Sequence, residues 1–179
     1  MPNVKLTLPQ IEQIFGKFEF KDVDGSILIL GDWVKNNLEV VNFPLVGRVE
    51  CNKKLTPVLT KIFTEIQTIQ NIKPIIDVKD FRAQGGCFVP RHILWNKNKP
   101  LSYHSWGIAI DINVKDNGYG VKPTQEPELV YLFKKYGFIW GGDWIRTNVD
   151  GSDNYKYCDG MHFEVGTDFC IQSGILVFV

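Results

Sequence analysis

The stretch that decides the fold is Ser102-Tyr103-His104-Ser105-Trp106-Gly107-Ile108-Ala109-Ile110-Asp111-Ile112-Asn113. An imidazole at His104 and a carboxylate at Asp111 stand on either side of the small residue Gly107. Their separation is too long for a single helical turn, and the alternation from Gly107 to Asn113 predicts a strand. We therefore expect His104 in the approach to this strand and Asp111 inside it.

An aspartate between Ile110 and Ile112 is the informative feature of this strand. Burying a carboxylate is costly unless it binds a cation or accepts several hydrogen bonds. A metal ion would satisfy Asp111, and so would backbone N–H groups or an arginine. The residue alone is compatible with either arrangement.

A second stretch, Asp159-Gly160-Met161-His162-Phe163-Glu164, supplies a further imidazole. A strand over 161–165 would place His162 and Glu164 on one face. A hydrolytic zinc site needs about three protein ligands and one open position for water. His104, Asp111 and His162 provide such a set, although each histidine alone is equally compatible with an ordinary hydrogen-bonded residue. Glu164 is expected either to support His162 or to be solvated.

Three further residues are candidates for the chemistry. Asp159 precedes His162 by three positions and would act as a general base beside a metal, whereas the alternative is a turn-forming Asp-Gly pair. Arg82 and Arg91 are candidates for holding an anionic substrate group, and a solvated arginine is the alternative for each.

Composition limits the class of protein. The 179 residues, 44% of them hydrophobic, are enough for one domain over 1–179 with a full core. The 20 basic and 20 acidic residues give no electrostatic footprint for nucleic acid or an anionic membrane. No apolar run approaches the roughly 20 residues needed for membrane insertion.

We see no signal peptide and expect synthesis in the cytoplasm. The cysteines form no C-x-x-C pair, so we expect free thiols at Cys51, Cys87, Cys158 and Cys170.

Hydrophobic periodicity predicts a mixed fold. Over 8–20 we expect a short helix that Gly16 would end, followed by an irregular stretch, and further helices are expected over 55–70 and 127–136. Strands are expected over 26–30, 40–49 (interrupted by Pro44), 74–78, 107–113, 138–140 and 161–165. The stretch 87–101 is expected to be a surface loop with His92 on its exterior. The predicted fold is α+β, a small antiparallel sheet that carries the zinc site with helices packed on one face.

The two motifs resemble those of the LAS zinc peptidases, which are the VanY-type D-alanyl-D-alanine carboxypeptidases and the L-alanyl-D-glutamate endopeptidases of phage lysins. The resemblance covers residues 75–165 and includes Gly141-Gly142-Asp143-Trp144 between the motifs. Residues 1–70 carry no motif. The fold implied is Hedgehog/DD-peptidase-like.

The resemblance implies that His104, Asp111 and His162 bind Zn²⁺. The family's catalytic acid is more often a glutamate, and Asp159 stands at that position. The family's arginine lies upstream of the first histidine and corresponds to Arg82 or Arg91, which the sequence does not separate.

The implied substrate is the stem peptide of bacterial peptidoglycan. The leading prediction is an L-alanyl-D-glutamate endopeptidase of phage or prophage origin, which would act on the cell wall once released. A D-alanyl-D-alanine carboxypeptidase or dipeptidase is the enzymatic alternative. The alternative of another class is a non-catalytic zinc-containing binding module, as in Hedgehog-type domains, or a virion structural part. The sequence does not determine the oligomeric state.

Overall fold

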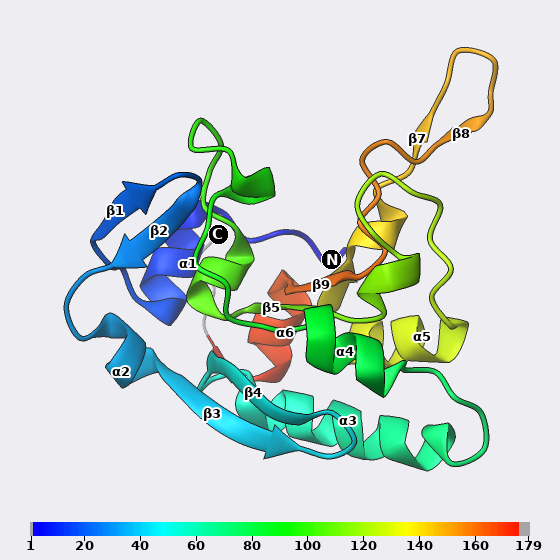
Figure 1. Cartoon of the computed structure of the whole chain (residues 1–179), viewed down its shortest axis with the longest axis horizontal. Helices are drawn as coiled ribbons and strands as arrows, with labels where there is room; N and C mark the ends of the chain where they lie inside the picture. The colour runs from blue at the N-terminus through cyan, green and yellow to red at the C-terminus, as the bar shows by residue number, and fades with distance from the viewer. Residues whose placement is uncertain (1, 176–179) are drawn as a thin grey trace.

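The computed structural model describes residues 2–175 (Figure 1). Its α-helices are α1 Leu8–Phe15, α2 Trp33–Asn37, α3 Thr56–Gln70, α4 Val78–Gln84, α5 Pro127–Lys135 and α6 Thr167–Gln172. Its strands are β1 Phe20–Val23, β2 Ser26–Ile29, β3 Leu38–Phe43, β4 Gly47–Asn52, β5 Ala109–Asp111, β6 Phe138–Trp140, β7 Arg146–Thr147, β8 Asp153–Asn154 and β9 His162–Val165. Short 3₁₀ turns are η1 Ile93–Trp95, η2 Tyr103–Trp106, η3 Val114–Asp116 and η4 Gly141–Asp143.

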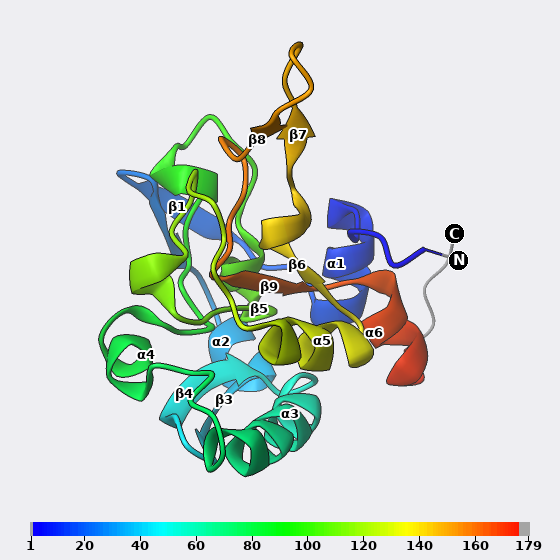
Figure 2. The same ribbon diagram turned by 90° about the vertical axis from the view of Figure 1, so that its right-hand side faces the viewer.

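A three-stranded antiparallel sheet in the order β5-β9-β6 lies at the centre of the molecule. Helix α5 covers one face of this sheet, and α3 lies beyond α5 (Figure 2). The contact between α5 and the sheet is aromatic, because the Phe133 ring lies 4.4 Å from the Phe163 ring and 5.2 Å from the Phe138 ring, measured between centroids. This packing holds β9 in place, and His162 is the first residue of β9.

Two-stranded hairpins surround the central sheet. The predicted extended stretch 40–49 is the β3–β4 hairpin, which reverses where Pro44 interrupts the pattern. Strands β1 and β2 pair across the Asp24-Gly25 turn. The β7–β8 hairpin projects from the body of the molecule in both views (Figures 1 and 2).

The predicted α+β fold with a small antiparallel sheet is confirmed, as are its three helices and the strands at 26–30, 107–113, 138–140 and 161–165. The strand predicted over 74–78 is wrong. Ile75 and Ile76 are buried without pairing in a sheet, and the chain turns into α4. The Asp77 carboxylate caps this helix by accepting hydrogen bonds from the N–H groups of Lys79 and Asp80.

Helix α3 contributes its buried face to the hydrophobic core and packs against α5 and β3. Leu59, Ile62, Phe63 and Ile66 lie on one face of α3 and are fully buried. Burying each such side chain contributes about 1.5–3 kcal/mol. Among residues 2–175, no helix is long and apolar enough to cross a membrane.

Candidate metal centre

Three separate elements bring the predicted ligands together. His104 lies in η2, whose first turn is capped by the Ser102 hydroxyl accepting from the His104 N–H. Asp111 ends β5 and His162 begins β9, and the two residues face each other in the antiparallel register. The chain passes from η2 into β5 through Gly107, whose φ of +62° is left-handed and whose Cβ would lie 2.9 Å from the Asn52 nitrogen. No larger residue fits there without displacing β4.

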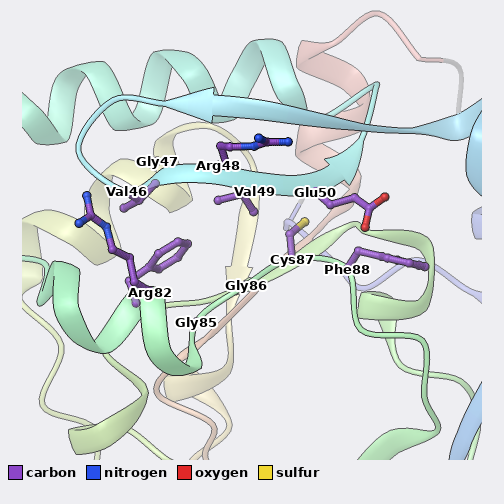
Figure 3. Close-up of a pocket in the computed structure, with 11 residues that line it drawn as sticks. Val46, Gly47, Arg48, Val49, Glu50, Arg82, Gly85, Gly86, Cys87 and Phe88 are labelled. Carbon is purple, nitrogen blue, oxygen red and sulfur yellow. The ribbon is translucent and has the colours of Figure 1, made fainter.

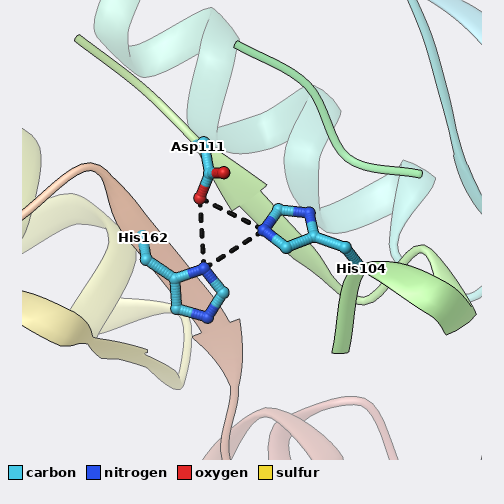
Figure 4. Close-up of side chains that lie close together, drawn as sticks. All are labelled: His104, Asp111 and His162. Atoms are coloured by element: carbon cyan, nitrogen blue, oxygen red, sulfur yellow. Dashed lines mark hydrogen bonds and ion pairs between the residues drawn. The ribbon is translucent and has the colours of Figure 1, made fainter. Parts of the chain in front are cut away.

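The three candidate ligand atoms form a compact triangle (Figure 4). His104 Nε2 lies 3.2 Å from Asp111 Oδ1 and 3.2 Å from His162 Nδ1. His162 Nδ1 lies 3.1 Å from Asp111 Oδ1. His104 is 0% exposed and His162 is 7% exposed, whereas the Asp111 side chain is 15% exposed.

The remaining ring nitrogens determine which atoms are free to bind a metal. His104 Nδ1 lies 2.8 Å from the Cys87 carbonyl oxygen, which only accepts hydrogen bonds, so this nitrogen carries the proton. His162 Nε2 lies 3.1 Å from Glu164 Oε2 and donates to that carboxylate. With both outer nitrogens protonated, the neutral rings direct their lone pairs at Asp111 Oδ1. Three such atoms at this spacing could hold a metal ion among them.

Zinc fits this arrangement. Zn–N and Zn–O bonds of about 2.0–2.2 Å at tetrahedral angles place neighbouring ligand atoms roughly 3.3 Å apart, close to the separations found here. Two imidazoles, one carboxylate and a position left for water are a donor set typical of hydrolytic zinc.

The surroundings of the triangle shift the pKa values of two of its members. Burial lowers the pKa of His162, but the hydrogen bonds to Asp111 and Glu164 have a larger opposite effect and raise this pKa to about 10. Burial likewise opposes ionisation of Asp111, but the two imidazoles hold the pKa of that carboxyl well below its usual range. A metal bound at His162 Nδ1 would take the place of any proton on that atom.

A cavity of about 200 Å³ opens beside the triangle, and both His162 and Asp159 line it. Asp159 Oδ1 is buried and has no hydrogen-bond partner in the described part of the chain. Burial, together with the Asp111 charge, raises the pKa of Asp159 to about 6, although His162 opposes the shift. Gly141 packs closely against Asp159, because a Cβ at position 141 would lie 2.4 Å from the Asp159 carbonyl oxygen.

The two candidate arginines lie in different places. Arg91 is half-buried and lines the same cavity as Asp159. Burial lowers the pKa of Arg91, and Asp111 and Asp159 oppose that shift. Arg82 is exposed on α4 and lines a separate cavity of about 490 Å³ between α4 and the β3–β4 hairpin (Figure 3).

Two residues complete the surroundings of His162. The sequence allowed Glu164 either to support His162 or to be solvated. In the structure Glu164 is 1% exposed and accepts a hydrogen bond from His162. Lys5 lies in the stretch without a motif, yet its Nζ is 2.9 Å from Glu164 Oε1 and its side chain lines the cavity. No pattern in the sequence predicts this contact, because it joins residues 159 positions apart.

His92 is not on the surface, as the sequence predicted, but is 6% exposed. Its Nδ1 lies 2.6 Å from the Lys99 carbonyl oxygen and its Nε2 lies 2.7 Å from Asp22 Oδ1. The prediction failed because the surrounding loop is polar in sequence, while the β1–β2 hairpin covers it in three dimensions. The four cysteines are free and buried, as expected.

Comparison with known families agrees with this geometry. Residues 95–165 match a family model described as D-alanyl-D-alanine carboxypeptidase. The matched segment contains His104, Asp111, Asp159 and His162, whereas both candidate arginines precede it. Searches of curated proteins and of solved structures gave no match. The match confirms that this chain resembles the VanY-like zinc peptidases over the segment that contains the candidate metal ligands.

Proposed function

We propose that this chain is a zinc-dependent peptidase that cleaves the peptidoglycan stem peptide as an L-alanyl-D-glutamate endopeptidase. One observation carries the proposal: three candidate ligand atoms lie 3.1–3.2 Å apart, and one of the ligands, His162, lines the same cavity as Asp159, whose carboxylate oxygen Oδ1 has no partner among the described residues. A metal triangle with an adjacent free base is the arrangement that metal-assisted peptide hydrolysis requires. The family match supports a peptidase.

Each residue has a distinct task in this mechanism. His104, Asp111 and His162 would hold Zn²⁺, which when bound polarises the scissile carbonyl and lowers the pKa of water. Asp159 accepts the proton of the attacking water and delivers it to the departing amine. A carboxyl pKa near 6 suits this exchange, because the group is ionised at neutral pH and still accepts a proton readily.

Arg91 is the arginine that we assign to the substrate. It lines the cavity that contains Asp159, whereas Arg82 lines a different cavity. A guanidinium at this place offers paired donors to a substrate carboxylate or to the developing oxyanion. Burial strengthens that interaction, because the local dielectric is low.

Two alternatives remain as proposals. The description of the matching family favours a D-alanyl-D-alanine carboxypeptidase, which would use the same residues on the other end of the stem peptide. A non-catalytic zinc-binding module would need the metal triangle but not a free base, so Asp159 Oδ1 would have no role. The cell wall is the place of action for either enzyme.

Mass spectrometry of muropeptides after incubation with the zinc-loaded protein distinguishes these proposals. Fragments with a new N-terminal D-glutamate are the expected products, whereas loss of a terminal D-alanine would indicate the carboxypeptidase. The zinc-loaded Asp159→Asn protein is the matched control and should leave the substrate intact. Unchanged muropeptides with metal-replete wild-type protein would refute the peptidase and favour the binding module.

A further inference from the structure

The loop before His104 contains an unusual pair of backbone conformations. Leu94 and Trp95 have φ values of +54° and +56°, in the left-handed region that is unfavourable for residues with a Cβ. Two such residues in succession persist only where the surrounding structure holds them, and such sites cluster where a protein binds ligands.

Contacts from the N-terminal hairpin hold this turn in place. The buried His92 side chain joins Asp22 of β1 to the Lys99 carbonyl oxygen, and the His92 N–H donates to the Gly25 carbonyl oxygen. The β1–β2 turn also fits closely under Trp95, since a Cβ on Gly25 would lie 2.0 Å from the Trp95 carbonyl oxygen. The β1–β2 hairpin therefore holds the turn in place.

This fixed turn presents an aromatic surface beside the metal centre. Trp95 is 55% exposed, yet it lines the cavity that also contains Asp159 and His162. The Arg91 guanidinium carbon lies 5.4 Å from the centroid of the Trp95 ring, which steadies the indole from one side. A large indole held rigid and half in water at the edge of a reactive cavity is suited to stack on a flat ligand.

The size of the cavity limits what the ligand is. At about 200 Å³ it is smaller than the roughly 300–1,000 Å³ of a typical ligand pocket, so it holds only the residues next to the cleaved bond. The stem peptide is joined to its glycan through L-alanine. Since an extended chain spans at most about 3.3–3.6 Å per residue, a sugar next to the L-alanyl bond stays close to the cleaved bond, whereas cleavage at a D-alanyl bond leaves the sugar several residues farther away.

We propose that Trp95 is a stacking platform for the N-acetylated hexosamine ring that carries the stem peptide, bound on the N-terminal side of the cleaved bond. The assignment rests on the proposed endopeptidase function and names its sugar-side subsite. The apolar C–H face of a pyranose ring packs against the indole, while the ring's polar groups remain in water or reach neighbouring donors.

Matched substrates isolate the sugar. One is an N-acetylmuramoyl peptide, and the other is the same peptide with only an acetyl group on its L-alanine. Trp95→Ala should lower kcat/KM on the muramoyl peptide roughly tenfold and leave the acetyl peptide within about twofold of wild type. Trp95→Phe should retain most of the preference. Leu94→Ala, at a neighbouring cavity-lining position with the same backbone conformation, is the control for disturbance of the turn and should affect both substrates alike.

Binding provides a readout independent of turnover. Calorimetric titration of the zinc-loaded Asp159→Asn protein should show tighter binding of the muramoyl peptide than of the acetyl peptide, and adding Trp95→Ala should abolish the difference. Equal losses on both substrates, or an unchanged difference in binding, would overturn the platform. If wild type cleaves neither substrate, the endopeptidase proposal fails, and the titration alone decides whether Trp95 binds the sugar.

Discussion

Replacing Glu164 by glutamine tests how the buried carboxylate controls the metal centre. Glu164 Oε2 accepts from His162 Nε2 at 3.1 Å and from Lys5 Nζ at 3.1 Å, while Oε1 lies 2.9 Å from the same Nζ. A glutamine side chain keeps the shape but replaces one oxygen by an NH₂ donor. Facing Lys5, that donor meets another donor, and facing His162 it favours the ring tautomer with the proton on Nδ1.

Either arrangement weakens zinc binding. A proton on Nδ1 blocks the atom that lies 3.1 Å from Asp111 Oδ1, and loss of the carboxylate charge makes the His162 ring a poorer ligand. Removing a partner of a metal-bound histidine lowers metal affinity about 10- to 100-fold. We expect a loss in this range for Glu164→Gln, which corresponds to about 1.4–2.7 kcal/mol.

Competition with a chromophoric chelator measures the zinc affinity of wild type and variant directly. Glu65→Gln is the matched control, because Glu65 also bonds a lysine and a second donor, Lys135 and Tyr136, but lies on α3 away from the triangle. The control should bind zinc like wild type. If the folded Glu164→Gln protein also binds zinc within about twofold of wild type, the tautomer argument is refuted.

Three further predictions concern the metal, the arginines and the core. Zinc at about 100 times its Kd should stabilise the fold by about 2.7 kcal/mol, raising Tm by roughly 5–11 °C in calorimetry, and Asp111→Asn should remove most of this shift. Arg91→Gln should lower kcat/KM about 100-fold while Arg82→Gln stays near wild type, and the reverse order would contradict the cavity assignment. Ile62→Ala should reduce the free energy of unfolding by about 2–5 kcal/mol in urea denaturation, and a loss under about 1 kcal/mol would contradict its complete burial.

Local patterns predicted the elements whose residues alternate or recur regularly. The apolar face of α3 and the alternation of β5 and β9 follow directly from the sequence, because side-chain period reports which face is buried. The type of secondary structure at Ile75-Ile76 was ambiguous, since two adjacent buried residues do not show the spacing that distinguishes a strand from a helix. The helix signal there was Asp77, whose capping of α4 is visible only as hydrogen bonds to the next turn.

Some residues of the candidate site were likewise predictable from local patterns, and others were not. His104, Asp111 and His162 were identifiable because polar residues of metal-binding type interrupt short, regular motifs, and the structure brings them within 3.2 Å of one another. The two arginines were inseparable in sequence, since both simply precede His104. The packing of distant elements places Arg91 in the cavity with Asp159 and Arg82 in a different cavity.

The sequence by itself therefore determined the α+β class, the main helices and the set of residues able to bind a metal. Only the tertiary structure decided that Lys5 reaches Glu164, that His92 is buried under the β1–β2 hairpin, and that Trp95 faces the cavity. The physical reason is the range of the interactions. Periodicity and capping act within a few residues of the chain, whereas these contacts depend on how distant elements pack.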